Sequence, residues 1–258
     1  MSSIVRALGL ASVYTMWVSG FVDLHCHWIP GIDDGAHDEV ESLALLRGLR
    51  ALGFERVIAT PHMRPGLFDN DRDALLAAFA AIEARLEHEQ GLPARGLSSE
   101  HFFDEIVLER LLMGQGVPYP GERAVLIEFR TSAFPPGLEQ RLAQLSRIGL
   151  TPVIAHPERY QPLWQDPERL EPLLDAGAVA LLDVAALAGK YGAWPERSAR
   201  QLLERGLYHA ACSDAHRVAD LPAVGRGMAL LGAQYGAAEL EALLGAGPRE
   251  ILEGKVRH

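Results

Sequence analysis

Short apolar runs alternate with longer stretches of helical periodicity from residue 21 onward. The apolar runs, which have the length and composition of strands, occupy residues 21–24, 56–60, 125–127, 152–155 and 209–212. The longer stretches, each typical of a helix and most of them followed by glycine, occupy residues 38–53, 71–90, 105–114, 137–148, 167–176, 198–205 and 221–252. This alternation predicts the α/β class, with a parallel sheet or barrel whose crossovers share one hand.

Nothing in the sequence divides this pattern into parts, since internal repeats, low-complexity linkers and breaks in composition are absent. We therefore expect one domain over residues 21–258, a length that commonly holds one α/β barrel. Residues 1–20 form an N-terminal extension of uncertain role. Residues 7–18 resemble a weak signal peptide but are too short to span a bilayer. An extra amphipathic segment, or a natural start at Met16, is the favoured interpretation.

Metal-binding side chains follow most of the apolar runs. The run 21–24 is followed by His25, 56–60 by His62, 125–127 by Glu128, 152–155 by His156 and 209–212 by Asp214. The carboxyl ends of parallel strands meet at one end of a barrel, so these side chains are expected to build one site from many strands. Such a site is typical of a barrel-type metallohydrolase.

Each of the two strongest motifs has two candidate ligands separated by one residue. His25 and His27 flank Cys26, and Asp214 and His216 flank Ala215. Alternate residues of a strand point to the same face, so each pair could hold one cation. Many H-x-H pairs occur without a metal, and the position at a strand end is what favours the ligand interpretation here.

The other candidates are weaker when each is taken alone. Asp33 and Asp34, between two glycines, would ordinarily form an exposed acidic turn, and a single histidine such as His62 is usually structural. Glu100 resembles any exposed glutamate. Glu128 differs because it continues an apolar run, where a plain surface role is unexpected.

Composition and charge exclude some classes of protein. The formal net charge is -10, whereas a nucleic-acid-binding surface is normally basic. The two cysteines, Cys26 and Cys212, both lie inside the motifs described above, and we interpret them as reduced thiols of a cytoplasmic protein. The C-x5-R loop of thiolate-dependent tyrosine phosphatases is absent. We expect neither a redox nor a ligand role for Cys212.

The motifs together resemble the PHP (polymerase and histidinol phosphatase) family, and within it the bacterial tyrosine-protein phosphatases encoded with capsule and exopolysaccharide genes. The resemblance covers about residues 21–220 and rests on six strings in this order: HCHWIPGIDDGA, ATPH, VLIEF, TPVIAHPERY, LAGKYG and SDAH. It implies a distorted (β/α)7 TIM-like barrel that holds three divalent metal ions. Manganese is the first choice, with iron or zinc as alternatives.

The resemblance also implies a role for each matching residue. The first metal would be held by His25, His27, Glu100 and Asp214. Glu100 would bridge to the second metal, completed by Glu128 and His156. The third would be held by Asp34, His62 and His216, with Asp33 as the alternative carboxylate. Water bridging two ions would become a hydroxide that attacks phosphorus, and Arg159 would bind the phosphoryl group.

Several departures from the family pattern put the substrate preference in doubt. Met63 stands where a second histidine is usual after ATPH, and residues 98–101 read SSEH without the expected glycine. Leu221 stands near the position of a family arginine, which Arg217 could replace. Four aromatic residues could either line a cleft for an aromatic phosphoester or pack in the barrel: Trp28, Phe68, Tyr160 and Trp164.

The leading hypothesis is a metal-dependent protein-tyrosine phosphatase that acts on the tyrosine-rich tail of a bacterial tyrosine autokinase controlling polysaccharide export. The alternative within the family is histidinol phosphatase or another small-molecule phosphoesterase. A non-catalytic metal-binding regulator of the kinase is the alternative of another class. We expect no nucleic acid and no stable membrane insertion, while the segment 221–258 could serve as a closing helix or as a contact in a homo-oligomer.

Overall fold

The computed structural model describes residues 20–256, and the expectations for residues 1–19 lie outside this part. The described strands are β1 (Phe21–Cys26), β2 (Phe54–Ala59), β3 (His62–Met63), β4 (Ala94–Leu97), β5 (Glu100–Phe102), β6 (Ala124–Glu128), β7 (Thr151–Ala155), β8 (Val179–Asp183) and β9 (Ala210–Cys212). The longer helices are α2 (Glu39–Ala51), α3 (Arg72–Leu86), α4 (Glu105–Leu112), α5 (Leu138–Arg147), α8 (Ala193–Glu204) and α9 (Leu221–Tyr235). Shorter ones are α6 (Gln161–Gln165), α7 (Glu171–Asp175), α10 (Ala237–Glu241) and α11 (Gly247–Glu253).

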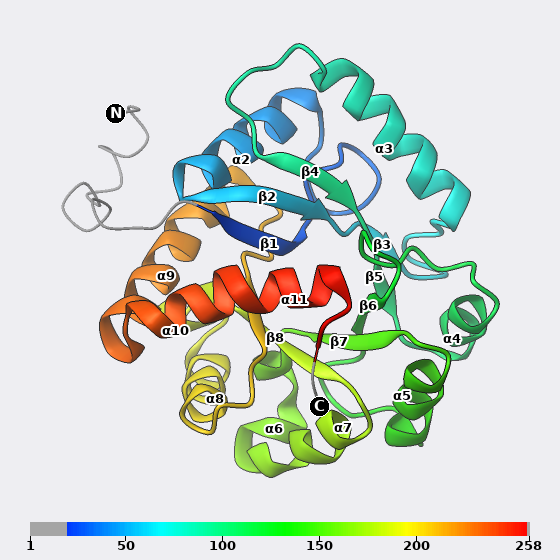
Figure 1. The fold of residues 1–258 in the computed structure, drawn as a ribbon, viewed down its shortest axis with the longest axis vertical. Coiled ribbons are helices and arrows are strands. Elements are labelled where there is room, and N and C mark those ends of the chain that lie inside the picture. The colour runs from blue at the N-terminus through cyan, green and yellow to red at the C-terminus, as the bar shows by residue number, and fades with distance from the viewer. Residues whose placement is uncertain (1–19, 257–258) are drawn as a thin grey trace.

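All strand pairs in the two sheets are parallel, as the alternating pattern predicts. One sheet has the order β1-β2-β4 and the other the order β3-β5-β6-β7-β8-β9. Backbone bonds continue from one sheet to the other on both sides. Glu100 N–H of β5 donates to Thr60 O, directly after β2, at 3.3 Å, and Asp214 N–H, shortly after β9, donates to His25 O of β1 at 3.0 Å. The α/β class is thus confirmed, with the helices arranged around the strands (Figure 1).

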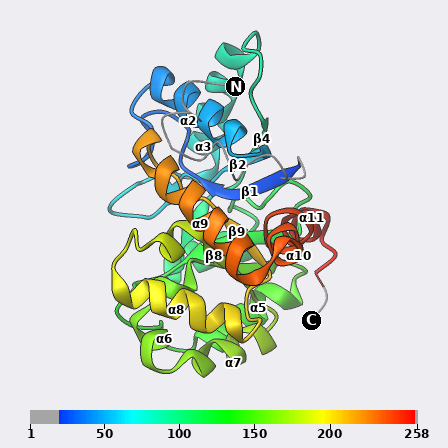
Figure 2. The same ribbon diagram turned by 90° about the vertical axis from the view of Figure 1, so that its left-hand side faces the viewer.

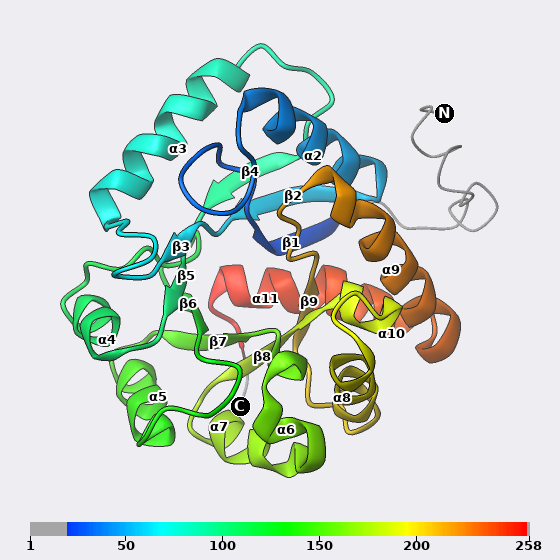
Figure 3. The same ribbon diagram turned by 180° about the vertical axis from the view of Figure 1, so that it is seen from behind.

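The outer helices cover the strands, and one helix crosses their centre. In Figures 1 and 2, α9 lies between α2 and α8. In Figure 1, α11 lies across the middle of the strands, where Ile251 packs with Val22 and Leu24. A larger apolar core lies between the strands and the outer helices. The carboxyl ends of the strands are left free at the other end of the molecule, which Figure 3 shows from behind.

Several helix boundaries follow directly from capping. Asp38 caps α2 by accepting a hydrogen bond from Glu41 N–H, and Asp71 caps α3 in the same way through Ala74 N–H. Three predictions were imprecise. The stretch 167–176 is a 3-10 turn followed by α7, and α8 begins at Ala193, before the predicted residue 198. The stretch 221–252 is divided at Gly236, whose φ of 95° ends α9.

Two of the four aromatic residues discussed above pack in the core. Trp28 and Tyr160 are fully buried, so a role in lining an open cleft is wrong for both. Phe68 and Trp164 remain partly exposed. Met63 is also buried in the larger core. No helix within residues 20–256 is long and apolar enough to cross a membrane.

Candidate metal centre

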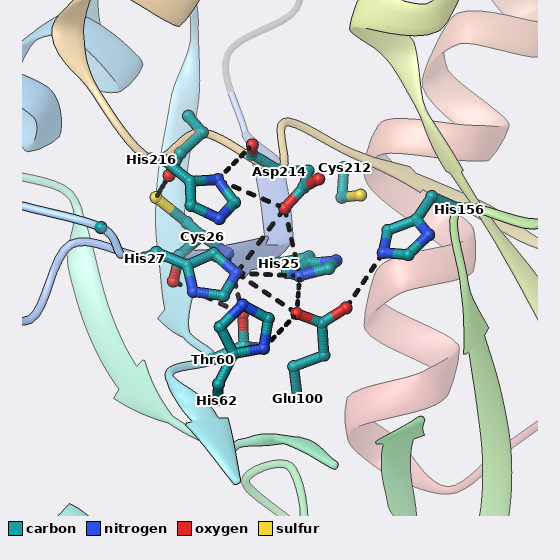
Figure 4. Close-up of polar contacts among 12 residues, drawn as sticks. His25, Cys26, His27, Thr60, His62, Glu100, His156, Cys212, Asp214 and His216 are labelled. Carbon is teal, nitrogen blue, oxygen red and sulfur yellow. Dashed lines mark hydrogen bonds and ion pairs between the residues drawn. The ribbon is translucent and has the colours of Figure 1, made fainter. Parts of the chain in front are cut away.

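Nine side chains that the sequence singles out as ligands converge at the carboxyl ends of the strands. Figure 4 shows His25, His27, His62, Glu100, His156, Asp214 and His216 among them. The nine side chains form four overlapping groups, and within each group the ligand atoms lie within 4.8 Å of one another. The groups are His27, Asp34, His62 and His216; His25, His27 and Glu100; His25, His156 and Asp214; and His62, Glu100 and Glu128. Residues up to 191 positions apart in the chain, from His25 to His216, are thus brought to one place.

The middle of the centre is formed by two histidines and two carboxylates. His25 Nε2 and His27 Nε2 are 3.1 Å apart. Glu100 Oε2 lies 3.2 Å and Asp214 Oδ1 also 3.2 Å from His25 Nε2. All of these side chains are buried. Imidazole nitrogens and carboxylate oxygens that face one point in a buried space are the donor set of a divalent transition metal.

Glu100 connects this middle to the neighbouring side chains. Its Oε1 lies 3.0 Å from His156 Nε2, and its Oε2 lies 3.1 Å from His62 Nδ1. Glu128 Oε1 is 3.5 Å from the same His62 nitrogen. The two oxygens of Glu100 therefore face different histidines, which is the arrangement that a bridging carboxylate requires.

The two adjacent aspartates have different surroundings. Asp34 Oδ1 lies 3.3 Å from His62 Nε2 and 3.5 Å from His216 Nε2, so this carboxylate faces the outer histidines. Asp33 Oδ2 instead lies 2.8 Å from His27 Nδ1 and accepts a hydrogen bond from His62 N–H at 3.1 Å. Asp33 therefore orients His27 from behind, and Asp34 is the one that belongs to a ligand group.

Unusual backbone conformations direct two of the side chains into the centre. His156 has φ 35° and Asp214 has φ 43°, both in the left-handed region that non-glycine residues seldom adopt. Each residue comes directly after or shortly after a strand, β7 and β9 respectively. Backbone strain of this kind costs about 1 kcal/mol or more and is common at functional sites.

Burial and mutual repulsion govern the protonation of the centre. Burial, with the neighbouring Glu100, raises the pKa of Glu128 to about 7. Burial, with the nearby Arg159, lowers the pKa of His156 to about 4. Burial opposes ionisation of Glu100 as well, but His25 and His62 hold its pKa well below the usual range. A charged Glu100 next to neutral His156 is the state in which both can bind a cation.

Five buried side-chain atoms of these nine residues lack a hydrogen-bond partner in the described part of the chain, and three of the five face other ligands: Glu128 Oε1, Asp214 Oδ1 and His62 Nδ1. Buried polar atoms in native proteins are nearly always satisfied. A divalent cation would satisfy all three, so the residues present fit a metal.

The two arginines expected near the phosphoryl group differ in their contacts. Arg159 Nη2 donates to Asp214 Oδ2 at 2.7 Å, and its guanidinium lies over the Tyr191 ring at 4.7 Å. Arg217 donates to Asp34 O at 3.1 Å and lies 3.5 Å from Glu41. Both arginines therefore adjoin the candidate ligands, Arg159 more deeply.

Position 221, where the family often has an arginine, has a packing role in this chain. Leu221 begins α9 and is buried, in close contact with Gly48 of α2. It therefore contributes no charge to the centre.

One supporting residue was not singled out from the sequence. Asp23 is buried and accepts hydrogen bonds from Ser213 N–H at 2.9 Å and from Ser213 Oγ at 2.5 Å. It also accepts one from His25 N–H at 3.3 Å. Asp23 thus ties β1 to the segment after β9, where His25 and Asp214 lie. Its place two residues before His25 could have suggested this role.

Both cysteines are free and buried beside the centre. Cys26 Sγ donates to Ala215 O at 3.2 Å, and Cys212 Sγ donates to Leu182 O at 3.3 Å. Burial raises the pKa of both thiols, and neither belongs to a ligand group. Their contacts are those of packed, protonated thiols.

Two relatives of this chain are named tyrosine-protein phosphatases. The tyrosine-protein phosphatase YwqE of Bacillus subtilis is 33% identical over 199 residues, which cover 76% of this chain and 78% of the relative. The tyrosine-protein phosphatase CpsB of Streptococcus pneumoniae is 26% identical and covers 90% of this chain and 98% of its own length.

Two solved structures are similar to this chain in fold. One match comes from the crystal structures of YwqE and CpsB, described as unique metal-dependent tyrosine phosphatases. It has a TM-score of 0.83 and 29% identity, and covers 92% of this chain and 96% of that chain. A phosphotriesterase homology protein of Escherichia coli shares the fold at a TM-score of 0.55 and 16% identity, with 91% and 99% covered.

A family model described as capsular polysaccharide synthesis, CpsB/CapC, matches residues 21–253, which is nearly all of the described chain. The chain therefore belongs to the CpsB/CapC family of capsular polysaccharide synthesis proteins.

Proposed function

We propose that this protein is a metal-dependent protein-tyrosine phosphatase that hydrolyses phosphomonoesters at the candidate metal centre. The observation that carries the proposal is the convergence of nine ligand-type side chains in a chain whose relatives are named tyrosine-protein phosphatases. The donor set supports up to three ions. Mixed imidazole and carboxylate ligation suits manganese first, with iron or zinc as alternatives.

The proposed ligand sets are those that the family resemblance implies; the groups in the structure also place Glu128 with His62, and His156 with His25 and Asp214. One ion would lie among His25, His27, Glu100 and Asp214, and a second among Glu100, Glu128 and His156. A third would lie among Asp34, His62 and His216. The distances from Glu100 to His25 and to His156 support its place between the first two ions.

The chain's own residues would position the phosphoryl group. When bound, the divalent ions supply an acidified water and polarise phosphoryl oxygens. Arg159, fixed between Asp214 and Tyr191, would donate hydrogen bonds to the phosphoryl oxygens and stabilise the charge that develops there. Arg217 would support it at the rim. A tyrosine phenolate has a conjugate acid with a pKa near 10, so its departure needs less acid assistance than an alkoxide does.

We also propose that the fold is a distorted seven-stranded barrel. Three features support closure: β2 leads into β3, β4 leads into β5, and His27 N–H donates to Ala215 O at 3.0 Å. If β2 with β3 and β4 with β5 each count as one barrel strand, the nine described strands make seven barrel strands. A closed barrel would place all candidate ligands at one mouth.

The proposed substrate is a phosphotyrosine protein, specifically a bacterial tyrosine autokinase that regulates capsule or exopolysaccharide synthesis. The proposed location is the cytoplasm, where thiols such as Cys26 and Cys212 stay reduced. The family description supports the link to capsule synthesis. A histidinol phosphatase, or a metal-binding regulator without turnover, would use the same side chains.

A substrate panel tests the proposal. The protein would be made metal-free, reloaded with manganese, iron or zinc, and given a phosphotyrosine peptide, a phosphoserine peptide and histidinol phosphate. Preference for phosphotyrosine is the expected result. Preference for histidinol phosphate would move the function to a small substrate, and stoichiometric metal binding without turnover would favour the regulator.

A further inference from the structure

A groove lined by tryptophan and arginine lies on the surface formed by α6 and the start of α8. It has a volume of about 520 Å³, and its lining includes Ser132, Gln161, Trp164, Gln165, Arg169 and Trp194. We refer to it as the Trp164–Trp194 groove. The two tryptophan rings are stacked, with centroids 5.8 Å apart and planes 9° from parallel. Trp194 is 47% exposed, which is unusual for so large an apolar side chain.

The same loops build the groove and the metal centre. Trp164 Nε1–H donates to Glu158 O at 2.9 Å, next to Arg159 in the chain. Trp194 follows Tyr191 by three residues, and Arg159 lies over the Tyr191 ring at 4.7 Å. Ser132 follows Glu128 by four residues. Figure 3 shows α6 and α8 side by side next to β8. The groove is therefore built on segments that adjoin Glu128, Arg159 and Tyr191 in the chain.

The charged residue in the lining of the groove is an arginine, Arg169, although the whole chain carries a net charge of -10. The Arg169 guanidinium lies 5.2 Å from the Phe134 ring centroid, and the Arg197 guanidinium lies 5.6 Å from that of Trp194. Neither arginine has a carboxylate partner among residues 20–256.

The neighbouring glutamates are already paired with other arginines. Glu168 lies 3.0 Å from Arg205, and Glu196 lies 3.0 Å from Arg200. Two guanidinium groups beside the groove are consequently free to pair with carboxylates from outside.

We propose that the Trp164–Trp194 groove binds the acidic segment of the substrate protein that flanks the phosphotyrosine. Carboxylate side chains of that segment would pair with Arg169 and Arg197, and its apolar or aromatic side chains would pack on Trp194. Exposed tryptophan and arginine are the residue types that contribute most to binding energy at interfaces. This inference rests on the proposed phosphatase function, which it extends from the phosphoryl group to the surrounding peptide.

The test compares three substrates of the full-length, metal-loaded protein: p-nitrophenyl phosphate, a phosphotyrosine peptide flanked by glutamates, and the same peptide flanked by glutamines. The variants are Trp194→Ala and the double variant Arg169→Gln/Arg197→Gln. Arg147→Gln is the matched control, since Arg147 is exposed at the end of α5, before β7 begins.

The wild type is expected to prefer the glutamate peptide over the glutamine peptide. Both groove variants should lower the kcat/KM ratio of glutamate peptide to p-nitrophenyl phosphate about tenfold, through KM. The control should keep the wild-type ratio. A wild-type protein indifferent to the glutamates, or groove variants with an unchanged ratio, would overturn the proposal.

A binding measurement separates this inference from the proposed function. If the wild type hydrolyses no p-nitrophenyl phosphate with any metal, the phosphatase function fails. Fluorescence anisotropy of the labelled glutamate peptide then still tests the groove. Docking is supported if Trp194→Ala binds the peptide more weakly than the wild type does, and if high salt weakens peptide binding by the wild type. Equal binding by all variants refutes it.

Discussion

Arg159 Nη2 donates to Asp214 Oδ2 at 2.7 Å, while the other oxygen of Asp214 lies 3.2 Å from His25 Nε2. One carboxylate thus faces the candidate ligands with one oxygen and holds the candidate phosphate-binding arginine with the other. Asp214 keeps its charge because His25 and Arg159 outweigh burial and hold its pKa well below the usual range. The position of Arg159 is therefore coupled to the integrity of the metal centre.

Arg159→Ala should lower kcat for a phosphotyrosine peptide about 100-fold, because the developing phosphoryl charge loses its fixed donor. Arg159→Lys should restore part of the loss, since one charge remains but the paired donors do not. Arg217→Ala should cost less, about tenfold, because Arg217 is already engaged by Asp34 O and Glu41. Steady-state kinetics at equal metal content measure all three. Equal losses in the two alanine variants would refute this ranking.

Gly35→Ala should damage the centre by a steric effect. A Cβ at this position would overlap the carbonyl oxygen of His27, because the turn that carries Asp33 and Asp34 packs against that backbone. We expect a loss of about 2 kcal/mol in unfolding free energy and weaker metal binding in calorimetric titration. Gly66→Ala is the control: an alanine at φ 83° is strained in its backbone, but its Cβ would have no atom within 4 Å. Wild-type metal affinity in Gly35→Ala would contradict the close packing seen here.

Glu158 should make the protein less stable as the pH rises. Burial, with the nearby Asp183, raises its pKa to about 8, from an ordinary value of about 4.3. Because the folded state holds this proton more tightly than the unfolded state, stability falls through this range, and the penalty is complete above pH 8. Glu158→Gln, which keeps an acceptor for Asp183 N–H, should gain roughly 3 kcal/mol over wild type between pH 5 and 8.

Urea unfolding at several pH values measures that difference. Glu168→Gln provides the control, because Glu168 is exposed and paired with Arg205. It should follow the wild-type dependence on pH. A Glu158→Gln curve parallel to that of wild type would show that Glu158 carries no raised pKa.

Metal removal should lower the thermal stability. The buried carboxylates and imidazoles of the centre face one another closely, so a chelator leaves them without a cation to compensate their charge and satisfy their free atoms. We expect Tm to fall by at least about 5 °C with chelator and to recover with manganese. Asp214→Ala should respond far less to added metal. A wild-type Tm independent of metal would argue against a preformed site.

The sequence predicted the parts of the centre that follow strong strands. His25, His156 and Glu128 end apolar runs, so the position of each at the mouth of the fold follows from parallel strand geometry. Glu100 has no such signal, because β4 and β5 around it are short and carry polar residues. Only the resemblance to a family identified it.

Other features depend on tertiary packing that no local pattern encodes. The distinct surroundings of Asp33 and Asp34 arise from the fold of one turn against His27. Trp28 follows the HCH motif yet is buried under Phe79 of α3, because the chain turns inward there. The Trp164–Trp194 groove joins helices from two separate crossovers, and periodicity within either helix cannot reveal it.

The most direct test of the account is the initial rate of phosphotyrosine-peptide hydrolysis by metal-free and manganese-reloaded protein, with His27→Ala and Asp214→Ala beside the wild type. Turnover should require metal, and the rates of both variants should be at least about 100-fold lower than that of the wild type. Turnover that survives metal removal, or that either variant retains, would contradict a catalytic metal centre at these residues.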